Sequence, residues 1–338
     1  MPPITNMDKK ILLAHGSGGG LYHSLIDEVF LKNFNNPFLS EKDDGAIVEI
    51  EGVKLAFTTD SYVVKPIFFP GGDIGKLSVF GTVNDLAVMG AEPLYISCGL
   101  IIEEGLEQRI LEKIALSMAQ SAKVAEVLLV TGDTKVVEKG GADKIYINTA
   151  GVGVVKKDLS VKRIEAGDRI ILSGNIGDHE VSVLLAREEF PFSSQVTSDL
   201  SPLNQLTSDI LGIDGIKFMR DPTRGGLATT LNEIAEGLGL GIIIYEDKIG
   251  VSDGVAAVCE LLGLDPLYLA NEGKIIVVVK KDSADEVLKR MRKNPLGKES
   301  EIIGEVTEEL NGRVCLRTKI GGTRILDMLT GEQLPRIC

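Results

Sequence analysis

Acidic residues recur in this chain where an apolar segment ends beside glycine, threonine, asparagine or proline. Loops at such positions can face a cleft. A single acid there is usually a helix cap or a turn former, but this chain has six such places. They hold Asp43 with Asp44, Asp60, Asp85, Asp133, Asp221 and Glu272. Because Mg²⁺ needs only one or two carboxylates besides phosphate oxygens and water, the set indicates a magnesium–nucleotide enzyme without naming its reaction.

Two common phosphate-binding fingerprints are absent from the chain. Lys76 follows Gly75 as in a P-loop, but Leu77 comes next and Pro70 stands where the first glycine is needed. Residues 16–21 (GSGGGL) lack the third glycine of the dinucleotide-binding fingerprint. This glycine run can still turn main-chain N–H groups toward an anion ahead of a helix-like stretch. A flexible N-terminal loop is the alternative interpretation.

The elements that must position these residues follow from hydrophobic patterning. The first half of the chain predicts a hairpin over 46–58 with its turn at Glu51 and Gly52, strands over 94–102, 126–131 and 145–155, and a helix over 106–122. The second half predicts helices over 178–188, 226–237 and 283–292, and strands over 169–173, 240–245, 274–280, 302–307 and 313–318. Both halves mix helices and strands. The polar stretch 156–160 is the best candidate for a domain boundary.

Charge and length limit the class of protein. The chain has 338 residues, which suggests two domains, and 36 Lys and Arg against 49 Asp and Glu give a formal net charge of −13. That balance argues against a surface that grips DNA or RNA through phosphates. The chain shows neither the basic-then-apolar start of a signal peptide nor an apolar run long enough for a membrane span. We therefore expect a cytoplasmic protein.

The four cysteines form no C-x-x-C pair and no zinc-like spacing. Cys98, Cys259 and Cys315 stand in apolar surroundings and are predicted to be free thiols in the core. Cys338 is the last residue of a glycine-rich end that we expect to be mobile. It is not a prenylation signal, because that signal needs the cysteine fourth from the end.

At this point the order of the motifs resembles one family. The motifs are residues 15–19 (HGSGG), 43–46 (DDGA), 58–61 (TTDS), 69–76 (FPGGDIGK), 83–87 (VNDLA), 132–137 (GDTKVV), 219–226 (MRDPTRGG), 270–273 (ANEG) and 335–338 (PRIC). Together they resemble the HypE family of hydrogenase-maturation proteins, within the superfamily of aminoimidazole-ribonucleotide synthetase (PurM) and selenophosphate synthetase. The resemblance runs from about residue 12 to the end of the chain.

The resemblance implies a mixed α/β (α+β) fold with two PurM-like domains. Residues 1–155 would form the N-terminal α/β domain, with the ATP and magnesium site and a β-barrel interface shared by a homodimer. Residues 156–320 would form a C-terminal α+β domain, and residues 321–338 a flexible tail that ends in the reactive Cys338.

The resemblance also implies a reaction. HypE-like proteins dehydrate an S-carboxamide on the terminal cysteine to a thiocyanate, using ATP and Mg²⁺, and the cyano group goes to the iron of a nickel–iron hydrogenase. The implied partners are the carbamoyltransferase HypF and the HypC–HypD iron scaffold. Two alternatives stay open: a PurM-type kinase or ligase that phosphorylates the carbonyl of a free small molecule, and a nucleotide-binding scaffold without chemistry.

The resemblance also implies roles for individual residues. Cys338 would carry the substrate. Lys135 and Glu272, buried beside each other, would orient and deprotonate the carboxamide nitrogen; which of them is the base is open, and a structural ion pair or a lysine on phosphate are the alternatives. The Mg²⁺ ligands would be Asp43 or Asp44 with Asp60, Asp85 and Asp221. Asp60, Asn84, Gly132, Asp133 and Thr134 would line the nucleotide, with Gly18, Gly19, His179 and Arg224 near phosphate. Helix caps, surface positions or pairing with a neighbouring acid are the alternatives for these residues.

Overall fold

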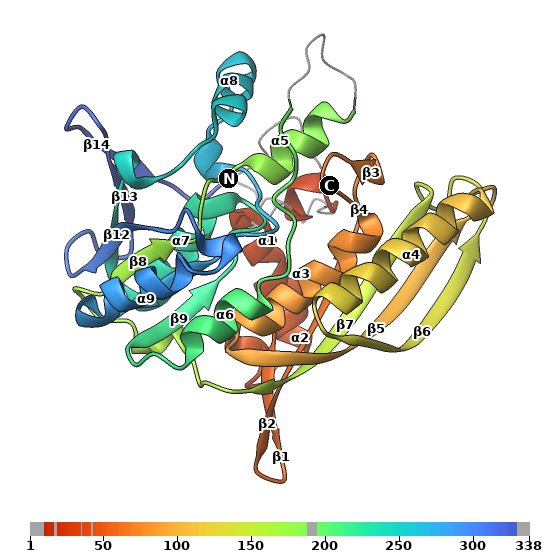
Figure 1. Ribbon diagram of the computed structural model, residues 1–338, viewed down its shortest axis with the longest axis horizontal. Helices are drawn as coiled ribbons and strands as arrows, with labels where there is room; N and C mark the ends of the chain where they lie inside the picture. Colours follow the sequence, from red (N-terminus) through yellow and green to blue (C-terminus); the bar gives the residue numbers. More distant parts are fainter. Residues whose placement is uncertain (1–9, 17–18, 35, 42, 188–194, 330–338) are drawn as a thin grey trace, which may run out of the picture.

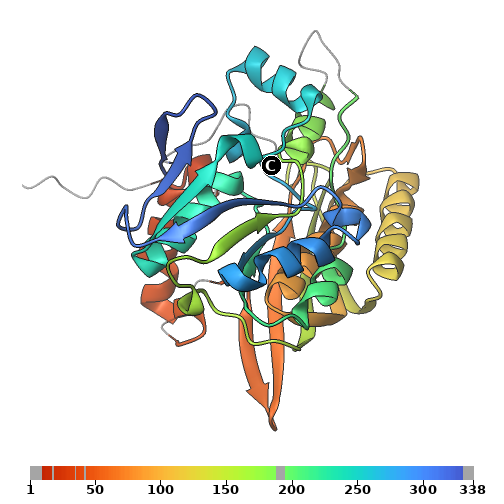
Figure 2. The ribbon, with the colours of Figure 1, turned by 60° about the vertical axis from the view of Figure 1, so that its left-hand side comes forward.

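The computed structural model describes residues 10–16, 19–34, 36–41, 43–187 and 195–329, and Figure 1 shows their arrangement. The first sheet has five strands in the order β1-β2-β7-β5-β6. These strands are β1 (Ala46–Ile50), β2 (Val53–Tyr62), β5 (Ala91–Glu103), β6 (Leu128–Val137) and β7 (Ile145–Val155). The predicted hairpin is confirmed: β1 pairs antiparallel with β2, and Glu51 and Gly52 form the turn with positive φ. Figures 1 and 2 show this hairpin projecting from the body.

Two helices cover one face of the first sheet. They are α3 (Ile74–Val88) and α4 (Gln108–Val124), and α3 packs on β2, β5 and β7 (Figure 1). The helix α4 connects the parallel strands β5 and β6. The sequence analysis did not predict α3. A helix is recognised by an apolar stripe, and 13 of the 15 residues of α3 are buried, so it has no polar face to set the period.

The second sheet has seven strands in the order β14-β13-β10-β12-β8-β11-β9. They are β8 (Arg169–Leu172), β9 (Ile216–Arg220), β10 (Gly241–Tyr245), β11 (Ile276–Val279), β12 (Glu301–Thr307), β13 (Val314–Arg317) and β14 (Thr323–Leu326). The helices of this half are α5 (Asp178–Leu185), α6 (Asn204–Leu211), α7 (Gly226–Leu238), α8 (Asp253–Leu262) and α9 (Ala284–Met291). The apolar residues of α7 pack on one face of the sheet, and those of α6 and α9 on the other.

The remaining elements are short. The N-terminal segment forms η1 (Leu13–Gly16), α1 (Gly20–Leu25), the π-helical η2 (Ile26–Leu31) and α2 (Lys32–Phe34). The hairpin of β3 (Phe68–Phe69) and β4 (Gly72–Asp73) precedes α3. Single 3-10 turns are η3 (Leu39–Glu41), η4 (Val161–Arg163), η5 (Glu246–Lys248), η6 (Pro266–Tyr268), η7 (Lys281–Ser283) and η8 (Pro295–Gly297). The mixed α/β architecture with two sheets confirms the predicted fold class.

The tail predicted from residue 321 needs a correction. Residues 323–326 form β14, which pairs antiparallel with β13. The reason is burial: Leu326 is 1% exposed and packs in the core beneath α7, so hydrophobic burial holds this segment despite its glycine-rich approach. Residues 330–338, with Cys338, lie outside the described residues.

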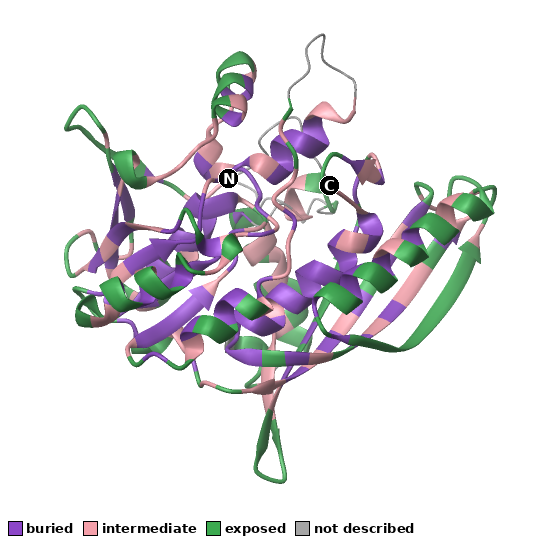
Figure 3. Cartoon of the chain, viewed as in Figure 1, coloured by how far each residue is buried: buried purple, intermediate pink, exposed green. Residues whose placement is uncertain are grey.

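Buried residues gather in the interior of the protein, and exposed residues lie on its outside (Figure 3). Cys98, Cys259 and Cys315 are buried free thiols, as predicted. The exposed strand β6 contrasts with the buried strands of the second sheet, of which β11 is buried at every position. Among the described residues, no helix combines the length and apolarity needed to cross a membrane.

Candidate active site

Four carboxylates from separate parts of the chain meet between the two sheets. Asp44 precedes β1, Asp60 lies in β2, Asp85 is in α3 and Asp221 follows β9. Thr58 joins two of them: its hydroxyl lies 2.7 Å from the main-chain oxygen of Asp44 and 3.0 Å from Oδ2 of Asp85. The sequence prediction that these acids assemble is therefore supported for these four, which we call the acid cluster.

The acid cluster is electrostatically strained. Burial raises the pKa of Asp85 well above its ordinary value, and the charges of Asp221, Asp44 and Asp60 raise it further. Burial likewise raises the pKa of Asp44 to about 8 and that of Asp221 to about 6, although Arg220 lowers both. Each carboxylate thus lies within the field of the others. Protonation relieves this repulsion in the protein alone, and a bound cation would also relieve it.

The positive charge of one buried guanidinium partly offsets the negative charge of the acid cluster. Arg220 Nη2 lies 3.0 Å from Asp44 Oδ1, and its Nη1 lies 3.4 Å from Glu233 Oε2. The other carboxylate oxygen of Asp44, Oδ2, is buried and has no hydrogen-bond partner among the residues that the structure describes. Such an atom is costly to bury in the ionised state. Asp44 therefore keeps one oxygen for a ligand.

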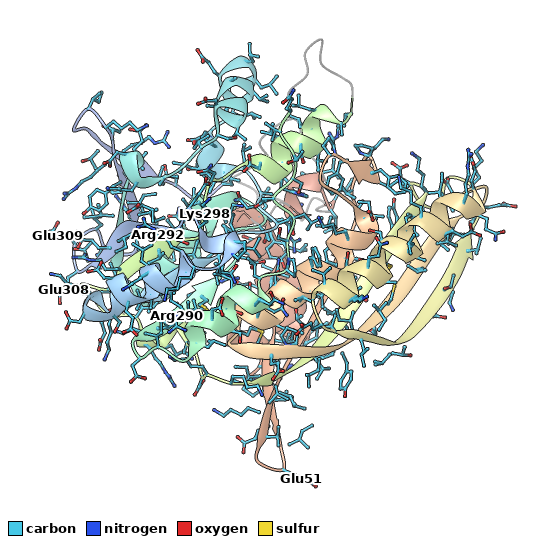
Figure 4. All side chains as sticks on the ribbon, viewed as in Figure 1. Glu51, Arg290, Arg292, Lys298, Glu308 and Glu309 are labelled. Carbon is cyan, nitrogen blue, oxygen red and sulfur yellow. The ribbon has the colours of Figure 1, made fainter. Side chains whose placement is uncertain are left out.

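Most other charged side chains of the protein lie on the surface, unlike the four of the acid cluster. Arg290 in α9 and Glu308 and Glu309 after β12 project from the surface (Figure 4). Within the described part of the chain, no group of three or more His, Cys, Asp or Glu side chains is placed to hold a metal ion unaided. Mg²⁺ on a nucleotide needs fewer protein carboxylates than that, because phosphate oxygens supply the rest of its ligands.

Glu272 lies beside the acid cluster on a fixed loop. Its main-chain oxygen accepts from the Asn84 amide at 3.2 Å, and its N–H donates to Asp199 Oδ1 at 3.2 Å. Burial raises the pKa of its carboxyl well above the ordinary value, and the charges of Asp221, Asp199 and Asp60 add to the effect. A carboxyl with a raised pKa is suited to accept a proton near neutral pH.

Lys135 does not meet Glu272 within one chain as described. Its side chain is 69% exposed on the edge strand β6, and its ammonium pairs with Asp133 at 2.8 Å. The burial predicted for Lys135 is therefore not found. Thr134 and Gly132 are exposed on the same strand. A Cβ on Gly132 would lie 2.6 Å from the Cys98 carbonyl oxygen, so the approach of β5 explains that glycine.

Two predicted nucleotide contacts are structural instead. Asn84 is fully buried, and its amide donates to Ser201 and Glu272 and accepts from the Leu203 N–H at 2.8 Å. It thus ties α3 to loops of the second half. His179 is 2% exposed, its Nδ1 lies 2.9 Å from Ser198 Oγ, and burial lowers its pKa to about 4. A neutral core histidine offers phosphate no charge, so neither the predicted phosphate contact nor a surface role applies.

The other predicted residues lie around the cluster. Arg224 is half-exposed, with Nη2 3.9 Å from Asp60 Oδ1 and its guanidinium 5.7 Å from the Tyr22 ring centre. Asp43 is exposed, and its charge helps to raise the pKa of Asp44. Gly19 caps α1. Gly18 and Cys338 lie outside the described residues.

The sequence analysis missed Arg220, Thr58 and Asp199 as parts of this site. Asp199 is 3% exposed and pairs with Lys274 at 3.2 Å while accepting from the N–H groups of Glu272 and Gly273. A signal existed for Arg220 and Thr58, because each lies within two residues of a predicted acid. No local pattern marks Asp199.

The fold and the cluster define a class of protein, and comparison with protein families agrees. The N-terminal domain model of the AIR synthase related proteins matches residues 42–155, and the C-terminal domain model matches residues 165–316. The chain is thus an AIR-synthase-related protein.

More similar proteins narrow the class. A carbamoyl dehydratase HypE of Bradyrhizobium diazoefficiens is 49% identical over 330 residues, covering 96% of this chain and 95% of the relative. A solved HypE–HypF complex superposes with a TM-score of 0.86 at 47% identity, covering 90% of this chain and all of that one. A HypE structure in complex with ATP gives 0.81 at 46%, covering 97% and 100%. The chain belongs to the HypE family of carbamoyl dehydratases.

Proposed function

We propose that this protein uses ATP to dehydrate an S-carboxamide on its own Cys338 to a thiocyanate, which supplies the cyanide ligand for the iron of a nickel–iron hydrogenase. The observation that carries the proposal is the acid cluster: the buried Arg220 guanidinium pairs with Asp44, and Asp44 Oδ2 has no hydrogen-bond partner among the described residues. Excess negative charge at this depth calls for a cation. We propose that bound ATP brings this cation, because the structure of a relative has been solved in complex with ATP.

The proposed Mg²⁺ ligands come from Asp44, Asp60, Asp85 and Asp221, with one or two of these carboxylates on each ion and Asp43 at the rim. Their raised pKa values support this assignment, because a divalent cation would stabilise the ionised form that burial disfavours. When bound, Mg²⁺ supplies charge neutralisation for the phosphoryl group in transfer. Arg224, half-exposed above Asp60, is placed to pair with a phosphate oxygen.

The reaction balances in two steps. The carboxamide oxygen attacks the γ-phosphorus of ATP, ADP leaves, and one N–H proton is lost, which gives an O-phosphorylated imidate. The second N–H proton is then removed as the C–O bond breaks, and phosphate leaves with that oxygen. The product is a thiocyanate, and the atoms of one water end in phosphate and released protons.

Glu272 is the proposed base for the second step. Its raised pKa supports the assignment, because a carboxylate made basic by burial accepts a proton from nitrogen more readily. Lys135 can assist only if another chain brings it to the site, since it is exposed and paired with Asp133 in this chain.

A homodimer would provide that second chain. The first sheet exposes large apolar side chains on β5 and β6, namely Tyr95, Ile101, Leu128, Val130 and Val136. A contiguous apolar surface on an edge strand is costly in water and prone to pairing. We propose that a second copy covers it and that Lys135, Asp133 and Thr134 reach the partner's nucleotide site from there.

HypF is the proposed donor of the carboxamide, supported by the solved HypE–HypF relative. The HypC–HypD scaffold is the proposed acceptor of cyanide, on the family resemblance. Cytoplasmic placement goes with this function because the reaction consumes ATP.

Intact mass spectrometry tests the proposal. Protein loaded by HypF is measured before and after Mg-ATP, and the C-terminal peptide is fragmented. We expect the loss of one water at Cys338, and no loading in a Cys338→Ala variant. ATP hydrolysis with an unchanged protein mass would indicate a free substrate instead, and no hydrolysis at all would indicate a scaffold.

A further inference from the structure

The segment that follows β14 is held to the body by three main-chain carbonyls. Asn232 Nδ2, from α7, donates to the Leu326 oxygen at 3.0 Å. Tyr268 Oη, from η6, donates to the Asp327 oxygen at 2.9 Å. The Gly20 N–H, at the start of α1, donates to the Leu329 oxygen at 3.0 Å. Donors from three separate elements thus fix residues 326–329, the last ones that the structure describes.

Gly19 is required by this contact. A Cβ built on Gly19 would lie 2.1 Å from the Leu329 carbonyl oxygen and 3.0 Å from its carbon. Its φ of −88° is open to any residue, so the glycine is explained by the close approach of another main chain and not by its own conformation. At Gly20 the added Cβ would meet nothing within 4 Å.

The helix α1, which binds the held segment through the Gly20 N–H, lies next to the acid cluster. The Tyr22 ring of α1 is 5.7 Å from the Arg224 guanidinium, which faces Asp60. His23 Nε2, on the same helix, is 3.1 Å from Glu233 Oε1. Glu233 in turn pairs with Arg220, the partner of Asp44, so α1 connects the tail to both sides of the cluster.

Nine residues separate Leu329 from the end of the chain. Fully extended, they span at most about 30 Å. A longer free tail would dilute its terminus over a larger volume, because effective concentration falls with the length of a tether.

We propose that Gly19, Asn232 and Tyr268, with the Gly20 N–H, form a tail anchor that confines Cys338 to the neighbourhood of the acid cluster. This proposal rests on the proposed function, because it assumes that Cys338 carries the substrate. It also assigns Gly19 to main-chain binding of the tail, where the sequence analysis expected a position near phosphate. The three residues are positioning residues: they act on the reaction through the location of Cys338.

A matched pair of glycine variants of the full chain tests the tail anchor. Gly19→Ala places its methyl against Leu329, whereas Gly20→Ala places the same methyl in open space and keeps the N–H donor. Hydrogen exchange of residues 19–25 and 323–329 is measured without loading or nucleotide. We expect faster exchange in both segments for Gly19→Ala and wild-type exchange for Gly20→Ala.

Two further readouts separate the tail from the nucleotide. In single turnovers of HypF-loaded protein at saturating Mg-ATP, we expect Gly19→Ala to slow loss of water about tenfold and Gly20→Ala less than about twofold. The Kd for ATP, from calorimetry, should stay within about twofold in both. A Gly19→Ala variant with wild-type exchange, or with weakened ATP binding and a normal single-turnover rate, would overturn the tail anchor.

Tyr268→Phe keeps the proposal falsifiable if Gly19→Ala does not fold. It removes only the hydroxyl that holds Asp327, and we expect faster exchange in residues 323–329 and a single-turnover rate about threefold lower, with an unchanged Tm. Unchanged exchange in this variant would also overturn the tail anchor. If the wild-type protein does not lose water at all, the proposed function fails, while the exchange results still decide whether the tail is anchored.

Discussion

The acid cluster should make the protein without Mg²⁺ less stable as the pH rises. Burial raises the pKa of Asp44 to about 8 in the folded state, against an ordinary value of 3.8. The folded state then binds the proton more tightly than the unfolded state, so its stabilising effect is fully present at low pH and is lost as the pH rises from 3.8 through about 8. Between pH 6.5 and 8 the loss from Asp44 amounts to roughly 2 kcal/mol, at 1.36 kcal/mol for each pH unit. For a chain of 338 residues, that loss corresponds to a fall in Tm of about 3 °C.

Calorimetry of wild type and Asp44→Asn in EDTA, at pH 6.5 and pH 8, measures this effect. The asparagine cannot ionise, so we expect the Tm of Asp44→Asn to fall by about 3 °C less than that of wild type over this interval. Asp247→Asn is the matched control, because Asp247 is an exposed acid. The window avoids His179, whose buried neutral ring affects the pH dependence at lower pH.

Two results would refute the reasoning. One is an equal fall in Tm in wild type and Asp44→Asn, which would mean that Asp44 is not a strained buried carboxyl. The other is a Tm of wild type that rises between pH 6.5 and 8, which would mean that the cluster is stable when ionised. Adding Mg-ATP at pH 8 should raise the Tm of wild type by mass action and should raise that of Asp44→Asn less.

The site and its surroundings lead to four further predictions. Glu272→Gln should slow loss of water from loaded protein by about 100-fold or more while ATP binding is kept; a wild-type rate would exclude it as the base. Mixing Lys135→Ala with Glu272→Gln protein should restore activity that neither variant has alone, since one site of each mixed dimer is then complete, and failure to restore it would place Lys135 in the same chain as its Glu272. Val136→Asp should shift the protein to monomers in analytical ultracentrifugation, because it puts a charge on the exposed apolar strand; an unchanged mass would place the interface elsewhere. Lowering the pH from 6.5 toward 4 should destabilise the protein through His179, because burial lowers its folded pKa to about 4 from an ordinary 6.5. An NMR titration that shows His179 charged at pH 6 would contradict this.

Local sequence determined much of the architecture. The hairpin of β1 and β2 was predictable because Glu51 and Gly52 interrupt two β-like runs, and the turn needs the positive φ that glycine adopts easily. The strands β5, β7, β10 and β12 were predictable from their apolar patterning. The positions of the acids could also be predicted, since an acid at the end of an apolar run is recognised from the sequence without knowledge of its neighbours in space.

Tertiary contacts decided the rest, because they join residues that are distant in the chain. The helix α3 has no polar face since both halves of the protein bury it, so its period was hidden. The strand β14 exists because β13 provides a partner and the core provides a place for Leu326. The same spacing in an isolated peptide would favour a flexible end.

The site shows the same division. The sequence by itself determined which carboxylates and which terminal thiol are available for chemistry. Only the tertiary structure decided that Arg220 balances Asp44, that His179 is a neutral core residue, that Lys135 faces away from Glu272 in one chain, and that Gly19 contacts the main chain of Leu329. The charges around a residue, its burial and the main chains that approach it all depend on which distant segments folding brings near. The neighbours of that residue in the sequence do not determine those segments.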